Sequence, residues 1–341
     1  MLNLKKEEVD FLVNPNMVSE LKNYLNNKKD KINTLAENLL KRNISNIIFV
    51  GCGSSNSVGT TLKYILDKYS YIHSHSYSGY EFINNTPEFL DQDSIVILTS
   101  HSGTTKEIKK ALKISKKIGA LTIANTKSSQ NSYLGKNARI VLDYNGEAGW
   151  VCQLYGLYLL FGSYINENNE MDKNIKPLLD DLEKIPNILD EIITKTEVEG
   201  RKAAKKAKDW EGFYTIADGP LFPLAYKVGV VSNMEFAWAH GSAIKSSEFS
   251  HGPIEIVEED VPFLFLIGTD QSRALTKKIH DFVESKGGKS ILFDYKDYSQ
   301  GLHQDLSPIL VYVPLEWFSY YYALEHNHNP DNTRYYGNQE L

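Results

Sequence analysis

The chain has little cysteine, no long apolar run and no excess of basic residues. Its two cysteines, Cys52 and Cys152, are too few for a disulfide framework or a metal cage. No apolar run is long enough to span a membrane, and none follows a basic N-terminal region. The formal net charge of −6 provides no broad positive field for nucleic acid. We expect a cytoplasmic protein without nucleic-acid or membrane partners.

The first half contains short apolar runs that alternate with helical patterns. Buried strands are predicted over residues 46–50, 94–99 and 121–124, and helices over 57–69 and 104–118. This alternation is typical of an α/β fold with a parallel sheet flanked by helices.

The second half repeats this alternation after a polar, helix-prone stretch. Strands are predicted over 213–217 and from 261 into the turn at Gly268, and a helix over 221–239. The separation of Gly53 from Ser100 nearly matches that of Gly219 from Gly268, which suggests a duplicated domain. We expect three parts: residues 1–168 with N-terminal helices and a first α/β domain, a helical connector over 169–210, and a second domain with a C-terminal tail over 211–341.

A hydroxyl-rich turn lies between the predicted strand 94–99 and the helix that follows. Ligands of open α/β sheets bind at the carboxyl ends of strands, and the first turn of a helix has unpaired N–H groups that attract anions. Gly103 allows close approach of the backbone to such an anion. Four hydroxyl groups are available in this turn, those of Ser100, Ser102, Thr104 and Thr105.

A second turn, formed by Gly53, Ser54 and Ser55, occupies the matching position after the first strand. The alternative to an anion site is an ordinary helix cap, because Thr104 and Glu107 have the spacing of a capping box. Neither turn contains a nucleotide-binding glycine motif. We expect the two turns to hold the phosphate of a phosphorylated sugar.

Glu235 and His251 are the candidate acid–base residues. Glu235 lies in the middle of a predicted apolar helix face that consists of Leu224, Val228, Val231, Glu235 and Trp238. Burial raises the pKa of a carboxyl group and suits it to proton transfer, and a histidine beside a Gly-Pro turn can transfer protons near neutral pH. Alternatively, Glu235 is a structural acid paired with a lysine or with His240, and His251 is a turn residue.

The histidine pairs of the chain do not predict a metal site. His73 and His75, and likewise His326 and His328, have the spacing of one strand face, but no cysteine or acidic cluster completes either pair. We expect both pairs to be structural or exposed, and we expect no metal or organic cofactor.

Several motifs resemble those of sugar isomerase (SIS) domains. The segments GCGSS at 51–55 and SHSGTTKE at 100–107 are similar to the two phosphate motifs of these domains. The segments MEFAWAH at 234–240 and SEFSHGPIEI at 247–256 resemble the second domain of fructosamine-6-phosphate deglycases, relatives of the isomerase half of glucosamine-6-phosphate synthase. The resemblance covers roughly residues 45–340.

The resemblance implies two tandem flavodoxin-like SIS domains and a homodimer or higher oligomer with shared active sites. It implies that Glu235 is the base and that His251 handles the sugar ring or acts as general acid, reaching the site from a neighbouring subunit. The implied phosphate ligands are Ser55, Ser100, His101, Ser102 and Thr105. Two positions depart from the family pattern: Asn338 replaces a C-terminal lysine, and Lys245 replaces a histidine.

The combined motifs predict a deglycase that cleaves a fructosamine 6-phosphate into glucose 6-phosphate and a free amine through an enaminol. A phosphosugar isomerase or an aminosugar-phosphate deaminase is the alternative, because either would use the same phosphate turn and base. A non-catalytic sugar-phosphate sensor fits less well, because the chain has no basic recognition helix. The amine part of the substrate is not specified by these motifs.

Overall fold

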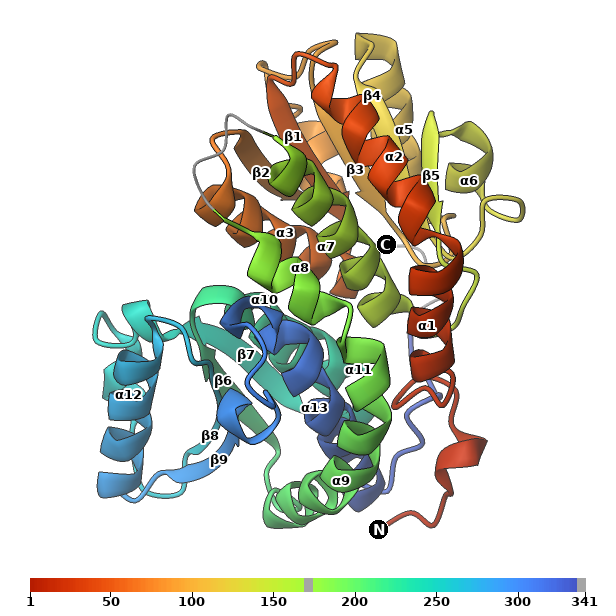
Figure 1. The fold of residues 1–341 in the computed structure, drawn as a ribbon. Helices are drawn as coiled ribbons and strands as arrows, with labels where there is room; N and C mark the ends of the chain where they lie inside the picture. Colours follow the sequence, from red (N-terminus) through yellow and green to blue (C-terminus); the bar gives the residue numbers. More distant parts are fainter. Residues whose placement is uncertain (169–173, 336–341) are drawn as a thin grey trace. The chain divides into compact units, whose positions relative to one another are not determined.

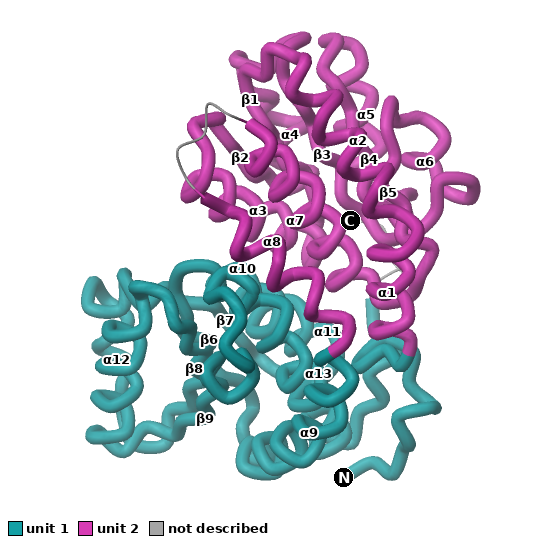
Figure 2. Tube along the Cα trace, in the orientation of Figure 1, with its two compact units in different colours: residues 1–15, 188–341 teal, residues 16–187 magenta. Residues whose placement is uncertain are grey.

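The computed structural model describes residues 1–168 and 174–335. The chain divides into two compact units (Figure 2): unit 1 comprises Met1–Pro15 and Ile188–Leu341, and unit 2 comprises Asn16–Asn187. Each unit has its own parallel sheet with helices packed on it (Figure 1). No helix in the described ranges is both long and apolar enough to cross a membrane.

Unit 2 contains a five-stranded parallel sheet with the order β2-β1-β3-β4-β5. Its strands are β1 (Asn46–Gly51), β2 (His73–Ser78), β3 (Ile95–Thr99), β4 (Leu121–Thr126) and β5 (Ile140–Asp143). Strands β3 and β4 are buried at every position, as expected of central strands covered on both faces. The predicted α/β fold with parallel sheets and flanking helices is therefore confirmed.

Helices cover both faces of this sheet (Figure 1). They are α1 (Met17–Asn27), α2 (Lys29–Leu40), α3 (Ser54–Tyr69), α4 (Gly79–Asn84), α5 (Lys106–Ile118), α6 (Tyr133–Asn137), α7 (Gly149–Glu167) and α8 (Lys176–Leu182). Helix α7 packs against α2 and α3, whereas α5 packs against α4 and α6. The sequence analysis did not identify α7, which is buried along almost its whole length.

Helix α5 shows how the apolar spacing positions the hydroxyl-rich turn. Ile108, Leu112 and Ser115 are buried, as predicted, and hold the helix against the sheet. Ile118 is 37% exposed, contrary to the prediction, because it is the last residue of the helix. The helix ends at Gly119, whose φ of 97° is the left-handed conformation that glycine adopts readily.

Unit 1 contains a four-stranded parallel sheet with the order β7-β6-β8-β9. Its strands are β6 (Gly212–Ala217), β7 (His240–Lys245), β8 (Pro262–Ile267) and β9 (Lys289–Asp294). In both sheets the first strand in the sequence pairs with the second on one side and the third on the other. The four strands of unit 1 thus repeat the order of β2-β1-β3-β4 in unit 2.

The longer helices of unit 1 are α9 (Ile185–Lys206), whose first residues belong to unit 2, α12 (Arg273–Ser285) and α13 (Ser307–Glu325). The predicted single helix over 221–239 is divided into α10 (Phe222–Tyr226), a π-helix (Lys227–Ser232) and α11 (Asn233–Ala237). A π-helix has more residues per turn than an α-helix, so the predicted apolar face is not continuous. Trp238, placed on that face by its spacing, lies beyond α11 and is 39% exposed.

A buried ion pair connects the π-helix of unit 1 to α13. The Nζ atom of Lys227 lies 3.1 Å from Oε1 of Glu316, and the two side chains are only 6% and 4% exposed. Lys227 also donates to Oγ of Ser232 at 3.1 Å and lies 4.9 Å from the ring centroid of Tyr312. Oε2 of Glu316 accepts the backbone N–H of Val13 at 3.1 Å. The pair therefore joins three segments of unit 1 that are distant in the sequence.

Replacing one member of this pair should destabilise unit 1 strongly. In Glu316→Ala the Lys227 ammonium loses its buried carboxylate partner, so we expect the free energy of unfolding to fall by about 3–5 kcal/mol. Urea unfolding monitored by circular dichroism measures this change. Lys277→Ala is the control, because it removes an ion pair with Asp281 in which both side chains are more than half exposed. Equal midpoints for the two variants would contradict a stabilising role for the buried pair.

Candidate active site

The two predicted phosphate turns follow strands that are direct neighbours in the sheet of unit 2. Strands β1 and β3 pair in parallel, with Val50 opposite Leu98 near their carboxyl ends. The strand order reverses at this place, since β1 is followed by β2 on one side and β3 by β4 on the other. Such reversal points are the usual ligand sites of open parallel sheets, because the connections lead away from each other and leave a crevice.

The first turn depends on the close approach of backbone segments at its glycines. Gly53 has φ 54° and ψ −126° and precedes α3, which begins at Ser54. At Gly51, a Cβ atom would lie 2.6 Å from the carbonyl carbon of Ser55, so a side chain there would displace the turn. Ser54 and Ser55 are half-buried, and the hydroxyl of Ser55 donates to Oε1 of Gln153 on α7 at 3.4 Å.

In the second turn, two hydroxyl groups organise the loop itself. Oγ of the buried Ser100 lies 2.8 Å from Oγ1 of Thr105 and accepts the N–H of Gly103 at 3.1 Å. Gly103 has φ 63°, and a Cβ atom there would lie 2.5 Å from that of Ser132. The exposed Ser102 accepts hydrogen bonds from the backbone N–H and the hydroxyl of Thr104, at 3.2 and 3.0 Å.

The capping box proposed as the alternative for this turn is not formed. The N-cap of α5 is Thr105 rather than Thr104, and its side chain makes no capping hydrogen bond. Gly53, the N-cap of α3, has no side chain to offer. Both helices therefore begin without a side-chain acceptor for their first N–H groups, and an anion can accept from such groups.

The ring of His101 points into a polar cluster of unit 2. Its Nδ1 lies 2.7 Å from the hydroxyl of Tyr144, and its Nε2 lies 3.7 Å from a carboxylate oxygen of Glu147. Burial lowers the pKa of His101, and the nearby carboxylate of Glu147 opposes this shift. Sequence reasoning missed Tyr144 and Gln153. A signal existed only for Gln153, a polar residue within an apolar helical run.

Glu235 lies on the short helix α11 of unit 1 and is half-buried. Burial raises the pKa of its carboxyl group, and the positive charge of Lys227 opposes this effect. Among the described residues it makes no hydrogen bond or ion pair, because Lys227 is bonded to Glu316 and His240 is exposed at the start of β7. Glu235 therefore does not form the structural ion pair that the sequence analysis gave as the alternative. A half-buried carboxyl group with a raised pKa is suited to proton transfer.

His251 lies in an exposed loop of unit 1, after a short 3₁₀ turn that ends at Glu248. Its backbone N–H donates to the carbonyl of Glu248 at 3.0 Å, and its ring makes no hydrogen bond or ion pair with the described residues. Gly252 follows with φ 137°. The exposed Lys245, one of the departures from the family pattern, places Nζ 5.1 Å from the ring centroid of Phe222. The other departure, Asn338, lies outside the described residues.

The structure brings the phosphate candidates together in unit 2, at the ends of β1 and β3, whereas Glu235 and His251 both belong to unit 1.

The C-terminal histidines contact backbone carbonyls: His326 lies 2.9 Å from those of Tyr322 and Trp210. Within the described parts of the chain, no cluster of histidine, cysteine and acidic residues could hold a metal ion.

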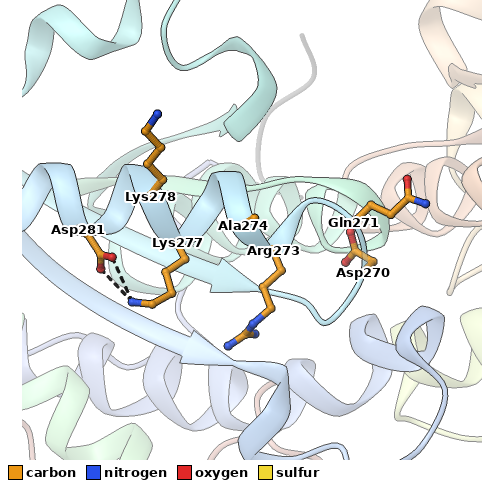
Figure 3. Close-up of a pocket in the computed structure, with 7 residues that line it drawn as sticks. All are labelled: Asp270, Gln271, Arg273, Ala274, Lys277, Lys278 and Asp281. Atoms are coloured by element: carbon orange, nitrogen blue, oxygen red, sulfur yellow. Dashed lines mark hydrogen bonds and ion pairs between the residues drawn. The ribbon is translucent and has the colours of Figure 1, made fainter.

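A pocket of unit 1 follows β8 and extends along α12 (Figure 3). Three of its charged residues form ion pairs: Lys277 bonds to Asp281 at 3.0 Å, and Arg273 forms two hydrogen bonds with Asp294 at 2.8 and 2.7 Å. None of the residues predicted from the sequence lines it. The lining residues are Asp270, Gln271, Arg273, Ala274, Lys277, Lys278 and Asp281.

Comparisons with known proteins agree with these features. The SIS domain family matches residues 40–175. The fructoselysine 6-phosphate deglycase of Escherichia coli (strain K12) is 41% identical over 340 residues, 99% of this chain and 98% of that protein. The fructosamine deglycase FrlB of Bacillus subtilis (strain 168) is 34% identical over 317 residues, 89% of this chain and 95% of its own.

The solved structures also include a relative of similar length. A Bacillus subtilis protein, proposed to be a phosphosugar isomerase, has a TM-score of 0.81 and 28% identity, and the match covers 95% of this chain and 99% of its own. The high identity over nearly the whole chain shows the family: this protein belongs to the family of SIS-domain proteins that includes fructoselysine 6-phosphate deglycase and fructosamine deglycase.

Proposed function

We propose that this protein is a deglycase that cleaves an N-fructosyl amino acid 6-phosphate into glucose 6-phosphate and the free amino acid. The observation that carries the proposal is the carboxyl group of Glu235, half-buried, without a bonding partner among the described residues and with a raised pKa. Its family relatives are named for deglycation of fructoselysine 6-phosphate and of fructosamine.

In this proposal the turns of unit 2 hold the 6-phosphate. The first N–H groups of α3 and α5 have no side-chain cap and are suited to a dianion. Gly53 is exposed in the first turn, whereas the buried Gly103 lets the second turn pack closely against Ser132. The proposed phosphate-binding residues are Gly53, Ser54, Ser55, Ser100, His101, Ser102 and Thr105.

The chemistry proposed for Glu235 is a proton transfer between two carbons of the substrate. The carboxylate removes a proton from C1, which the C2 ketone has made acidic, and an enaminol forms. Return of the proton to C2 gives an imine at C1, and water hydrolyses this imine to glucose 6-phosphate and the amine. His251 assists ring opening or protonates the leaving side. This route requires neither a metal nor an organic cofactor.

The same proposal includes the domain organisation and assembly. Unit 1 repeats the strand order of the SIS-matched unit 2, which supports a second SIS domain over residues 211–341 and therefore a tandem arrangement. A cytoplasmic homodimer or higher oligomer fits the exposed loop of His251, if that residue acts in a neighbouring subunit. The isomerase-like structural relative keeps phosphosugar isomerisation as the second candidate activity.

A substrate panel tests the activity itself. Purified protein incubated with fructoselysine 6-phosphate should release glucose 6-phosphate, measured by coupling to glucose-6-phosphate dehydrogenase. Unphosphorylated fructoselysine should react far more slowly, because it lacks the group that the two turns bind. Glucosamine 6-phosphate and fructose 6-phosphate serve as comparison substrates. Preferred turnover of either one would replace the deglycase proposal with a deaminase or an isomerase.

Glu235→Gln should lower kcat by about 10²–10⁴-fold while leaving KM nearly unchanged, because the amide retains the shape of the side chain but cannot take a proton. Steady-state kinetics with fructoselysine 6-phosphate measure both constants. Glu259→Gln is a matched control on an exposed loop of the same unit and should retain full activity. Full activity of Glu235→Gln would remove Glu235 from the mechanism.

The pH dependence should reflect the raised pKa of Glu235. A base must be deprotonated to act, so kcat/KM should fall as the pH decreases through this pKa. Because burial raises it, the acidic limb should lie above about 4.3, the ordinary value for glutamate. A profile of kcat/KM against pH, measured over the range in which the protein stays folded and binds its substrate, locates the limb. A limb at the ordinary glutamate value would show that burial does not tune this group.

A further inference from the structure

A chain of hydrogen bonds connects the two phosphate turns of unit 2 from behind. The hydroxyl of Ser55 donates to Oε1 of Gln153 at 3.4 Å, and Nε2 of Gln153 donates to the hydroxyl oxygen of Tyr144 at 3.2 Å. That hydroxyl lies 2.7 Å from Nδ1 of His101. Gln153 is 2% exposed and Tyr144 is fully buried, so water does not replace a lost bond. We call these four residues the relay.

The direction of the relay determines the tautomer of His101. Tyr144 accepts from Gln153, and its own hydroxyl proton is then directed at Nδ1 of His101. Nδ1 is therefore an acceptor, and the neutral ring carries its proton on Nε2. That nitrogen lies 3.7 Å from a carboxylate oxygen of Glu147, so the N–H faces a negative charge. The hydrogen bonds of the relay therefore all run the same way: Ser55 donates to Gln153, Gln153 donates to Tyr144, and Tyr144 donates to His101.

The surroundings of His101 can support either charge state. Burial lowers its pKa most, the carboxylates of Glu147 and Glu20 raise it, and the ammonium of Lys127 lowers it. Lys127 forms an ion pair with Glu147. Glu20 accepts the backbone N–H groups of Glu147 and Ala148 at 2.8 and 2.9 Å. Burial favours the neutral ring, although 42% of the side chain is exposed, and a carboxylate is in place to pair with an imidazolium.

We propose that binding of a phosphate group at Ser55 reverses the relay and causes His101 to take up a proton. The inference rests on the phosphate site proposed above. An anion oxygen accepts the hydroxyl proton of Ser55, so Oε1 of Gln153 loses its donor. Rotation of the Gln153 amide by half a turn exchanges its oxygen and nitrogen and restores both bonds: Nε2 donates to Ser55, and Oε1 accepts from Tyr144.

The proton balance follows from this reversal. With its hydroxyl proton directed at Gln153, Tyr144 presents only lone pairs to His101, so Nδ1 must carry a hydrogen. Moving the existing proton from Nε2 would leave a lone pair 3.7 Å from the carboxylate of Glu147, which is less favourable than an N–H group at that place. His101 therefore keeps the proton on Nε2 and takes a second proton from solvent onto Nδ1. The imidazolium pairs with Glu147, and the only new covalent bond is this N–H bond.

The test measures proton uptake on binding of glucose 6-phosphate, the proposed product. The heat of binding is measured by calorimetric titration in two buffers with different ionisation enthalpies, and the difference gives the number of protons taken up. The pH is about 7.5, where a phosphate monoester is already largely dianionic. The unmodified protein should take up a substantial fraction of one proton per ligand bound. Tyr144→Phe lacks the hydroxyl that links Gln153 to His101, so it should bind the ligand with uptake reduced at least about fivefold.

Two further variants keep the test decisive. Tyr155→Phe removes another buried hydroxyl of unit 2, one that donates to the carbonyl of Leu182 at 3.2 Å outside the relay, and its uptake should equal that of the unmodified protein. Gln153→Met breaks the relay at a second place and should reduce the proton uptake as Tyr144→Phe does. If one of these two variants folds poorly, the other still gives the test.

Each outcome bears on a different claim. Undiminished uptake in Tyr144→Phe and Gln153→Met would overturn the relay, since the anion would then act on His101 through space. Binding to the unmodified protein without proton uptake would overturn the linkage and leave the phosphate site intact. Failure of glucose 6-phosphate to bind at all would overturn the phosphate site and, with it, this inference.

Discussion

The parallel pairing of β1 with β3 is the constraint on which the candidate site of unit 2 depends. These strands are separated in the sequence by a helix, an edge strand and a second short helix, yet their carboxyl ends are adjacent. The connection after β1 leads toward one edge of the sheet and the connection after β3 toward the other edge. The two helices, α3 and α5, nevertheless begin next to each other, because β1 and β3 are neighbours. The left-handed backbone conformations at Gly53 and Gly103 shape two turns that this pairing places next to each other.

Within the second turn, two of the hydroxyl groups proposed for phosphate binding also hold the loop together. Ser100 and Thr105 bond to each other, so they shape the loop. The first N–H groups of α5 have no side-chain cap and supply the positive end of the helix dipole. Behind the turns, the buried side chains of Gln153 and Tyr144 connect the Ser55 hydroxyl to the ring of His101.

In unit 1 the electrostatic interaction that matters most for Glu235 is the ion pair between Lys227 and Glu316. Both charges are buried, and each compensates the other, while Glu316 also accepts the N–H of Val13. Glu235 is left with only a long-range attraction to Lys227, too small to cancel the effect of burial on its pKa. A direct ion pair with Lys227 would have kept Glu235 ionised and made it a weaker proton donor and acceptor near neutral pH.

Local sequence determined the elements whose periodicity is regular. Apolar runs predicted the buried strands β1, β3 and β4, and the spacing of Ile108, Leu112 and Ser115 predicted the buried face of α5. The hydroxyl-rich turn and Glu235 could also be identified as candidates, because residue type and position next to such elements are visible in the sequence. Only the tertiary structure decided that the helix before Trp238 contains a π-segment and that Thr105 rather than Thr104 is the N-cap. It also decided that Gln153 and Tyr144 meet behind the turns, because contacts between residues far apart in the chain depend on packing that no local pattern encodes.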